Sequence, residues 1–119
     1  MSWYLSKIVF RIICGDGKHT AQFDEQLRLI KADNREDAFY KAQDIGKKEE
    51  ETFFNQKEQL VQWRFIAVCE IYQLNEMTHG AELYSRIAER KDPEQYEYIL
   101  NKKAENILLT DSHQLLQIA

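Results

Sequence analysis

Proline and glycine are scarce in this sequence, with one Pro and four Gly among 119 residues. Both residue types interrupt regular structure, so most of the chain is free to form helices and strands. Cysteine is nearly as rare: Cys14 and Cys69 are the only two, and no C-x-x-C pair occurs. This excludes a disulfide scaffold, and we expect two reduced thiols in the core, since each lies in an apolar run. A disulfide between them would need adjacent strands and an oxidising compartment.

An excess of positive charge is also absent, because the formal net charge is −4. Proteins that bind DNA or RNA usually present a basic surface, so this charge argues against a nucleic-acid partner. No apolar run approaches the ~20 residues needed to cross a bilayer. The first residues lack the charged start and long apolar stretch of a signal peptide. The sequence therefore predicts a cytoplasmic protein without a membrane partner.

The residues that are present predict one folded domain. Hydrophobic residues make up 44% of the chain and charged residues 30%, and six Phe, six Tyr and two Trp are available for a core. A chain of this length can bury such a core without disulfides or metal ions. We therefore expect a single α+β domain over residues 1–119, with residues 92–119 as a C-terminal helical extension of the same domain.

Alternating apolar residues predict a β-hairpin at the start of the chain. In the segment 3–14 every second position forms an apolar face, which contains Tyr4, Ile8, Phe10, Ile12 and Cys14. A Gly-Asp-Gly turn lies in the loop 15–22. The segment 23–32 then alternates again, with Phe23, Leu27 and Leu29 on one side.

The rest of the chain predicts two helices and two more strands. Asp33 or Asn34 can cap a helix over residues 35–54, whose apolar stripe is Ala38, Ala42, Ile45 and Phe53. Residues 61–74 predict a central strand, with one face made of Trp63, Phe65, Ala67, Cys69 and Ile71 and the other containing Ile66, Val68, Tyr72 and Leu74. Residues 81–87 predict a fourth strand. The expected fold is thus an antiparallel sheet of about four strands in the order β-β-α-β-β-α, with a long helix packed on one face and a C-terminal helix.

The C-terminal helix has the clearest start signal, because Asp92 can cap it and Pro93 suits its first turn. The stretch from 107 to 119 is apolar, and Thr110 or Asp111 could cap one more short helix. Apolar residues in such number must be covered by this subunit or by another protein. We therefore expect a homo-oligomer or a protein partner bound through the C-terminal tail.

Motifs that announce catalysis or a cofactor are missing. The sequence has no phosphate loop, dinucleotide fingerprint or nucleophile elbow. Its three histidines, His19, His79 and His113, are far apart and have no second ligand at helical spacing. We therefore assign no catalytic residue, no metal ligand and no cofactor.

Glu49 is the first candidate for a binding site. At 3.6 residues per turn it lies in line with Ile45 and Phe53, and a carboxylate on an apolar stripe is costly unless it is paired. It either reaches water or a structural Arg at the end of the helix, or it lines a cleft.

A second group of candidates lies on the predicted strands. Glu82, Tyr84 and Arg86 share a strand face, and Arg64 could join them if the strands pair. Cross-strand ion pairs are the ordinary interpretation. The alternative is a polar groove walled by Trp63 or Trp3 that holds a small polar ligand or a peptide. Acid–base work by Glu49 and Glu82 would require the two carboxylates to meet.

Several segments resemble a family of small bacterial proteins that is catalogued as a domain of unknown function. The segments are Trp3-Tyr4-Leu5-Ser6-Lys7, Leu27-Arg28-Leu29-Ile30-Lys31-Ala32, the residues Ala38, Ala42, Gly46 and Glu49, then Trp63-Arg64-Phe65 and Gly80-Ala81-Glu82-Leu83-Tyr84-Ser85. The resemblance covers roughly residues 3–88. It implies a bacterial cytosolic setting, and it implies that Glu49, Trp63 and Glu82 matter for folding or for function.

Two functions follow as hypotheses. The first is a non-catalytic binding or protein-interaction module that associates with itself, because four strands and one covering helix leave a sheet face open. The alternative is a small ligand-binding domain or enzyme that uses a polar groove near Glu49 and Glu82. Nucleic-acid binding ranks third, since acidic residues outnumber the basic ones that are interleaved with aromatics.

Overall fold

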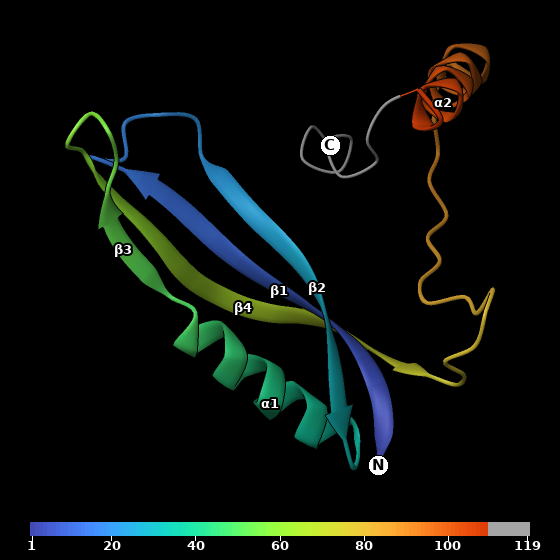
Figure 1. The fold of residues 1–119 in the computed structure, drawn as a ribbon, viewed down its shortest axis with the longest axis horizontal. Coiled ribbons are helices and arrows are strands. Elements are labelled where there is room, and N and C mark those ends of the chain that lie inside the picture. The colour runs from blue at the N-terminus through green and yellow to red at the C-terminus, as the bar shows by residue number, and fades with distance from the viewer. Residues whose placement is uncertain (110–119) are drawn as a thin grey trace. The chain divides into compact units, whose positions relative to one another are not determined.

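The computed structural model of this chain describes residues 1–109. Within them it has an α+β fold with the predicted order β-β-α-β-β-α (Figure 1). Residues Met1–Ser85 form one compact unit and contain the sheet with the first helix. A second compact unit begins at Arg86 and contains the second helix.

The sheet of the first unit is antiparallel throughout and has the strand order β2-β1-β4-β3. Its strands are β1 (Ser2–Cys14), β2 (Gln22–Ala32), β3 (Glu51–Phe54) and β4 (Leu60–Leu74). The predicted hairpin is confirmed as β1 and β2, and the predicted central strand is confirmed as β4. The sheet therefore has two long inner strands, one long edge strand and one edge strand of four residues.

One face of the sheet carries the core, as the alternation in β1 predicted. Tyr4, Ile8 and Phe10 of β1 are buried there. Ile30 of β2, which lies opposite Tyr4, is buried with them. The helix α1 (Arg35–Lys48) packs on this face, which we call the helix face (Figure 1). Burial of large apolar side chains between a sheet and a helix is the main stabilising term of such a fold.

The start and the packing of α1 follow from its sequence. Asn34 caps the helix, because its side-chain oxygen accepts a hydrogen bond of 2.8 Å from the backbone N–H of Asp37. Ala38, Ala42 and Gly46 are the buried positions of the helix. A Cβ atom at Gly46 would lie 2.4 Å from the ring of Phe65, so only glycine permits this close approach to the sheet.

The predicted end of this helix was wrong. The helix ends at Lys48 instead of continuing to 54, and residues 51–54 form β3 beside the start of β4. The spacing of Ile45, Glu49 and Phe53 continues the helical period, but Phe53 in fact stacks on Trp63 from the neighbouring strand. A tertiary contact therefore outweighs the local pattern.

The strand predicted over residues 81–87 was also wrong, since residues 81–90 have no regular secondary structure. Tyr84 packs its ring edge-on against Tyr72, with ring centroids 5.4 Å apart. Because the side chain of Tyr72 projects from a sheet face, this segment lies over that face and does not extend the sheet. Alternation of apolar residues gives a strand only where a partner strand can accept its backbone hydrogen bonds.

Two β-bulges in β4 change which side chains face the core. Lys7 pairs with Glu70 and Ile8 pairs with Val68, so Cys69 between them has no partner in β1. Ile66 is likewise left without a partner, because its neighbours Ala67 and Phe65 pair with consecutive residues of β1. Each bulge reverses the alternation beyond it, which turns Val68 toward the helix face, where it packs against the core. The predicted faces of this strand, with Ala67 and Cys69 beside Phe65, were therefore wrong.

The cysteines do not lie in the core as expected. Both are free thiols, but Cys69 is exposed at its bulge and Cys14 is half-buried at the end of β1.

The second unit contains α2 (Pro93–Ile107), which begins where Asp92 and Pro93 predicted. The Asp92 side chain accepts a hydrogen bond of 3.0 Å from the backbone N–H of Gln95. No residue of α2 is buried, and its exposed apolar residues are Tyr98, Ile99, Leu100 and Ile107. The further short helix predicted at Thr110 or Asp111 lies outside the described residues. Among residues 1–109, neither helix is long and apolar enough to span a membrane.

Candidate functional site

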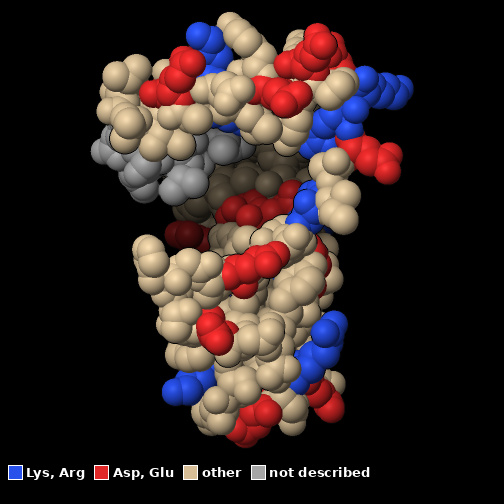
Figure 2. Space-filling view, turned by 90° about the vertical axis from the view of Figure 1, so that its right-hand side faces the viewer, with Lys and Arg blue, Asp and Glu red and all other residues tan. Residues whose placement is uncertain are grey.

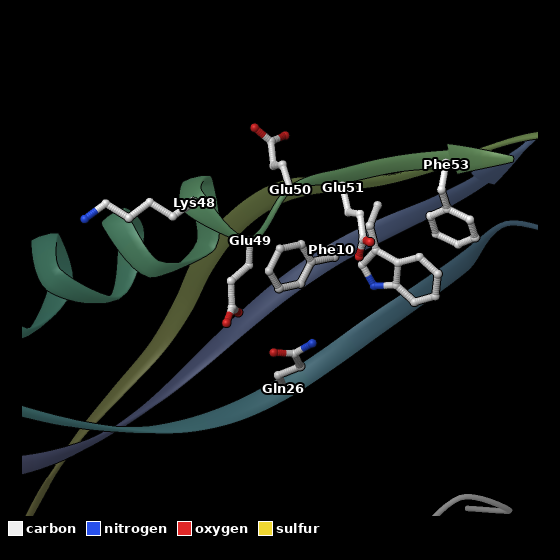
Figure 3. A pocket seen from close by; sticks show the side chains of 8 residues that line it. Phe10, Gln26, Lys48, Glu49, Glu50, Glu51 and Phe53 are labelled. Atoms are coloured by element: carbon white, nitrogen blue, oxygen red, sulfur yellow. The ribbon is translucent and has the colours of Figure 1, made fainter.

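A cavity of about 640 Å³ opens on the helix face where α1 ends and β3 begins (Figure 3). We call it the Trp63 pocket. It is lined by residues from all four strands and from the end of α1, namely Phe10, Gln26, Lys48, Glu49, Glu50, Glu51, Phe53 and Trp63. Two of the sequence candidates, Glu49 and Trp63, thus meet in one concavity.

Glu49 ends α1 and is held by an arginine. Its backbone N–H donates a hydrogen bond of 3.1 Å to the carbonyl of Ile45, and its carboxylate forms an ion pair with Arg28 of β2. Arg28 also donates hydrogen bonds of 3.0 and 2.8 Å to the side-chain oxygen of Gln26. Glu49 therefore both pairs with an arginine and lines a cavity.

Trp63 is half-buried and its indole ring is held on two sides. Its Nε1–H donates a hydrogen bond of 3.1 Å to Asp24, which also accepts a hydrogen bond of 2.6 Å from Gln26. The ring of Phe53 stacks on the indole, with ring centroids 6.4 Å apart and planes inclined by 21°. These contacts fix the orientation of the aromatic wall before any ligand arrives.

The two acidic residues that follow Glu49 have different roles. Glu50 accepts a hydrogen bond of 3.0 Å from the backbone N–H of Phe65, so it ties the chain after the helix to β4. Glu51 is exposed and lies directly opposite Trp63 in the pairing of β3 with β4. Figure 3 shows its side chain among those that line the pocket. Within residues 1–109 its carboxylate has no hydrogen bond or ion pair, so it is the carboxylate of the pocket that a ligand could engage.

The other sequence candidates do not line this pocket. Arg64 is exposed and lies opposite Arg11 in the strand register. It follows Trp63 directly, so its side chain projects from the other face of the sheet. Glu82 is exposed on the irregular segment, where Tyr84 packs on Tyr72. Arg86 begins the second unit. The predicted groove required Glu49 and Glu82 to share one concavity, and the Trp63 pocket contains only Glu49 of the two.

Several lining residues escaped the sequence reasoning, and one pattern could have found some of them. Asp24, Gln26 and Arg28 alternate along β2 and form a polar row on the helix face. When a row of polar side chains lies on the core face of a sheet, it indicates either a cavity or an ion-pair network there. Glu51 and Phe53 gave no such signal, because they were assigned to the helix.

His19 has a structural role in the loop between β1 and β2. Its Nε2 accepts a hydrogen bond of 3.0 Å from the backbone N–H of Cys14, and its Nδ1 lies 2.9 Å from the carbonyl of Thr20. The Nδ1–H tautomer satisfies both contacts. Among residues 1–109, no group of three or more His, Cys, Asp or Glu side chains is placed to hold a metal ion.

The charges on the surface in Figure 2 are mixed. Both acidic and basic side chains are visible on the face shown there.

Residues 3–85 match a protein family described as a domain of unknown function, DUF4288. The match spans well over half of the chain and includes α1 and the four strands apart from Ser2, the first residue of β1. It agrees with the resemblance of the same segments noted from the sequence. No curated protein and no solved structure matches the chain. The chain therefore belongs to the DUF4288 family.

Proposed function

We propose that this member of the DUF4288 family is a non-catalytic binding module whose Trp63 pocket holds an organic cation, an ammonium or a guanidinium group. The bacterial cytosolic setting implied by the resemblance is part of this proposal. The observation that supports it best is the position of the Glu51 carboxylate beside a fixed aromatic wall. Such a combination is typical of sites that bind cations over aromatic rings.

The aromatic wall supplies the first part of the affinity. A cation over the face of Trp gains roughly 0.5–2 kcal/mol, and the gain is larger where water is excluded. Trp63 is half-buried and held by Asp24, so a ligand would not have to order the ring. Phe10, which is 1% exposed, closes the bottom of the cavity.

The charge of the pocket supplies the second part. Its lining has three carboxylates and one ammonium, and Lys48 extends away from the cavity along the side of α1 (Figure 3). Two of the carboxylates are already engaged, Glu49 by Arg28 and Glu50 by the backbone of Phe65. Glu51 is thus the residue to which a cation would add a new ion pair.

The same bonds argue for binding and against acid–base catalysis. A pair of catalytic carboxylates needs two groups that can change their protonation state near the reacting atom. Glu49 and Glu50 instead hold the end of α1 against the sheet. Glu82, which the catalytic alternative required, does not line the cavity.

Fluorescence of Trp63 tests the proposal. A Trp3→Phe variant leaves Trp63 as the only indole, since the chain has two Trp. Titration with arginine amide, with tetramethylammonium and with acetate distinguishes a peptide-like guanidinium, a free ammonium ion and an anion. We expect saturable quenching by one or both cations and none by acetate.

Two variants that each remove one negative charge, one inside the pocket and one outside it, show where the cation binds. In the Trp3→Phe background, Glu51→Gln should weaken cation binding roughly two- to fivefold, which is the range for a partly exposed ion pair. Glu82→Gln, which removes the same charge outside the pocket, should bind as the parent does. Equal affinity in all three proteins, or quenching by acetate instead of the cations, contradicts the proposal.

The exposed apolar residues of α2 favour a second candidate, a protein partner of the C-terminal part. Tyr98, Ile99 and Leu100 are exposed in the second unit. Scattered apolar residues are normal on a surface, but a helix with no buried residue has its apolar side available. A Leu100→Glu variant should lower the mass of any complex measured by light scattering, whereas Gln95→Glu near the helix start should not.

A further inference from the structure

The outer edge of β2 is the longest unpaired edge of the sheet within the described residues. The strand has 11 residues and pairs with β1 on one side, while β3 at the opposite edge has four residues. Exposed long edge strands are templates for pairing with another chain. Proteins protect such edges with short strands, bulges or charged side chains. The bulges of this sheet lie in β4, and β2 has the charged residues Asp24, Glu25 and Arg28.

On the side that faces away from α1, β2 has three large apolar side chains and one acidic side chain, Glu25, which pairs with Lys7. Phe23 and Leu27 are each 53% exposed there, and Leu29 is 45% exposed. Residues Asp24, Gln26 and Arg28 alternate with them and project to the helix face. A strand with an apolar row on one side and a charged row on the other can specify the register of a partner strand.

The free length of this edge favours one register. At its C-terminal end the Lys41 ammonium donates a hydrogen bond of 3.0 Å to the carbonyl of Lys31, which ends the accessible edge there. The strand begins at Gln22, so the free stretch runs from Gln22 to Ile30 and its midpoint is Gln26. If two copies of this stretch pair antiparallel about Gln26, every residue from Gln22 to Ile30 has a partner in the other copy.

This register pairs chemically matched residues. Asp24 of one chain would lie opposite Arg28 of the other, and Phe23 opposite Leu29. Opposite charges and apolar pairs directly across an antiparallel ladder each contribute roughly 0.2–1 kcal/mol, and a twofold axis makes every such pair occur twice. Two pairs of this register are thus complementary, one in charge and one in hydrophobicity, while Glu25 would lie opposite Leu27.

We propose that a second copy of this chain pairs with the outer edge of β2, antiparallel and with Gln26 on the twofold axis, which joins the two sheets into one. The two Trp63 pockets then lie on the same face, one on each side of the axis, since Gln26 lines each pocket. The inference is independent of the cation proposal, because the pocket could bind a ligand in a single chain.

Disulfide trapping tests the register. In a Cys14→Ser, Cys69→Ser background, Gln26→Cys places two thiols directly opposite each other, at a Cα separation of roughly 4.5–5.5 Å that a disulfide can span. Gln22→Cys is the matched control, because its counterpart would lie eight residues, or roughly 26 Å, along the partner strand. We expect oxidation to crosslink the first variant and to leave the second monomeric on a denaturing gel.

Light scattering with charge variants provides the second measurement. The parent should have twice the 14.2 kDa mass of one chain. Phe23→Lys alone and Leu29→Glu alone should weaken the dimer, and mixing the two should restore it, because a lysine at 23 then faces a glutamate at 29. A variant with both Phe23→Lys and Leu29→Lys should remain monomeric, and circular dichroism checks that each variant is folded.

Three outcomes overturn the proposal. The first is a parent that stays monomeric at high concentration. The second is a dimer that crosslinks through position 22 as readily as through position 26. The third is a dimer that Leu100→Glu abolishes while Phe23→Lys with Leu29→Lys leaves it intact, since that result places the interface on α2. None of these results bears on cation binding, so the two proposals fail separately.

Discussion

The two faces of the sheet are built from the same alternating strands but differ in what covers them. On the helix face, Ile8 and Phe10 are buried completely or nearly so beneath α1. On the opposite face, which we call the open face, Phe23, Leu27 and Leu29 keep about half of their surface exposed. The contacts described there come from Tyr84, which packs on Tyr72, and from a row of charged side chains. The comparison shows that amphipathic alternation in a strand specifies two faces without specifying which one becomes the core.

Two phenylalanines on opposite faces provide the strongest test of this comparison. Phe10→Ala should lower the free energy of unfolding by about 3–5 kcal/mol, because it leaves a cavity in the packed face. Phe23→Ala on the open face should lower it by no more than about 1 kcal/mol at concentrations where the chain is monomeric, since the ring is already half exposed. Guanidinium-induced unfolding measures both, and equal losses would show that the open face is covered in solution.

Gly46 gives the next largest effect, because the helix face depends on its close approach to the sheet. A methyl group at this position would lie 2.4 Å from Phe65 and 3.2 Å from Ile8. Overpacking costs about 1–3 kcal/mol, while replacing Gly in a helix gains about 1 kcal/mol, so Gly46→Ala should destabilise by up to about 2 kcal/mol. Lys47→Ala, at the exposed neighbouring position, is the control and should be nearly neutral. A higher stability of Gly46→Ala would contradict the packing described.

The strands of the sheet could be predicted because their alternation is a local property of the sequence. The face that each strand turns toward the helix could not. The register Tyr4 to Ile30 places the apolar row of β2, with Phe23 and Leu27, on the side opposite to the core row of β1. That register depends on the geometry of the loop 15–21 and on the polar partners of Asp24, neither of which a period-two pattern contains.

The candidate site was predictable to a similar extent. Glu49 attracted attention because its charge interrupts an apolar stripe, and the structure places it at the pocket with Trp63. The expectation for Glu82 depended on a strand at 81–87, which does not form. The extra residues Ile66 and Cys69 reversed the alternation of β4 in two places. A bulge changes the side-chain direction without a characteristic residue type, so the sequence pattern gave no sign of it.

The cap of the covering helix tests how much of the helix face depends on the local start of α1. Asn34→Ala removes the 2.8 Å bond to the N–H of Asp37 and should lower the free energy of unfolding of the first unit by about 1 kcal/mol. Asp92→Ala removes the corresponding cap of α2, in the second unit. Near-ultraviolet circular dichroism, dominated by the two tryptophans of the first unit, should report a loss of stability for the first variant and not for the second.

The smallest effect concerns the polar row of the open face, where Lys7 forms ion pairs with Glu25 at 2.9 Å and with Glu70 at 3.3 Å. These carboxylates hold the pKa of Lys7 above its usual range, chiefly through the bond to Glu25. The hydrogen bond from the Tyr72 hydroxyl to Glu70 raises the pKa of Tyr72 to about 12. Both folded-state values are raised, so both groups stabilise the fold fully below about pH 10, the ordinary value of the unfolded chain, and this contribution is lost as the pH rises further.

A rapid pH jump followed by tyrosinate absorbance tests this on the folded chain before alkaline unfolding begins. The difference between the parent and Tyr72→Phe should show one phenol that ionises near pH 12. Glu70→Gln should move that midpoint downward, because the carboxylate that accepts the phenol proton is gone. Glu76→Gln removes the same charge a few residues along the chain and should leave the midpoint unchanged. A midpoint near 10 in the parent would mean that Tyr72 and Glu70 do not meet in solution, and the open face would then lack the polar row that distinguishes it from the face beneath α1.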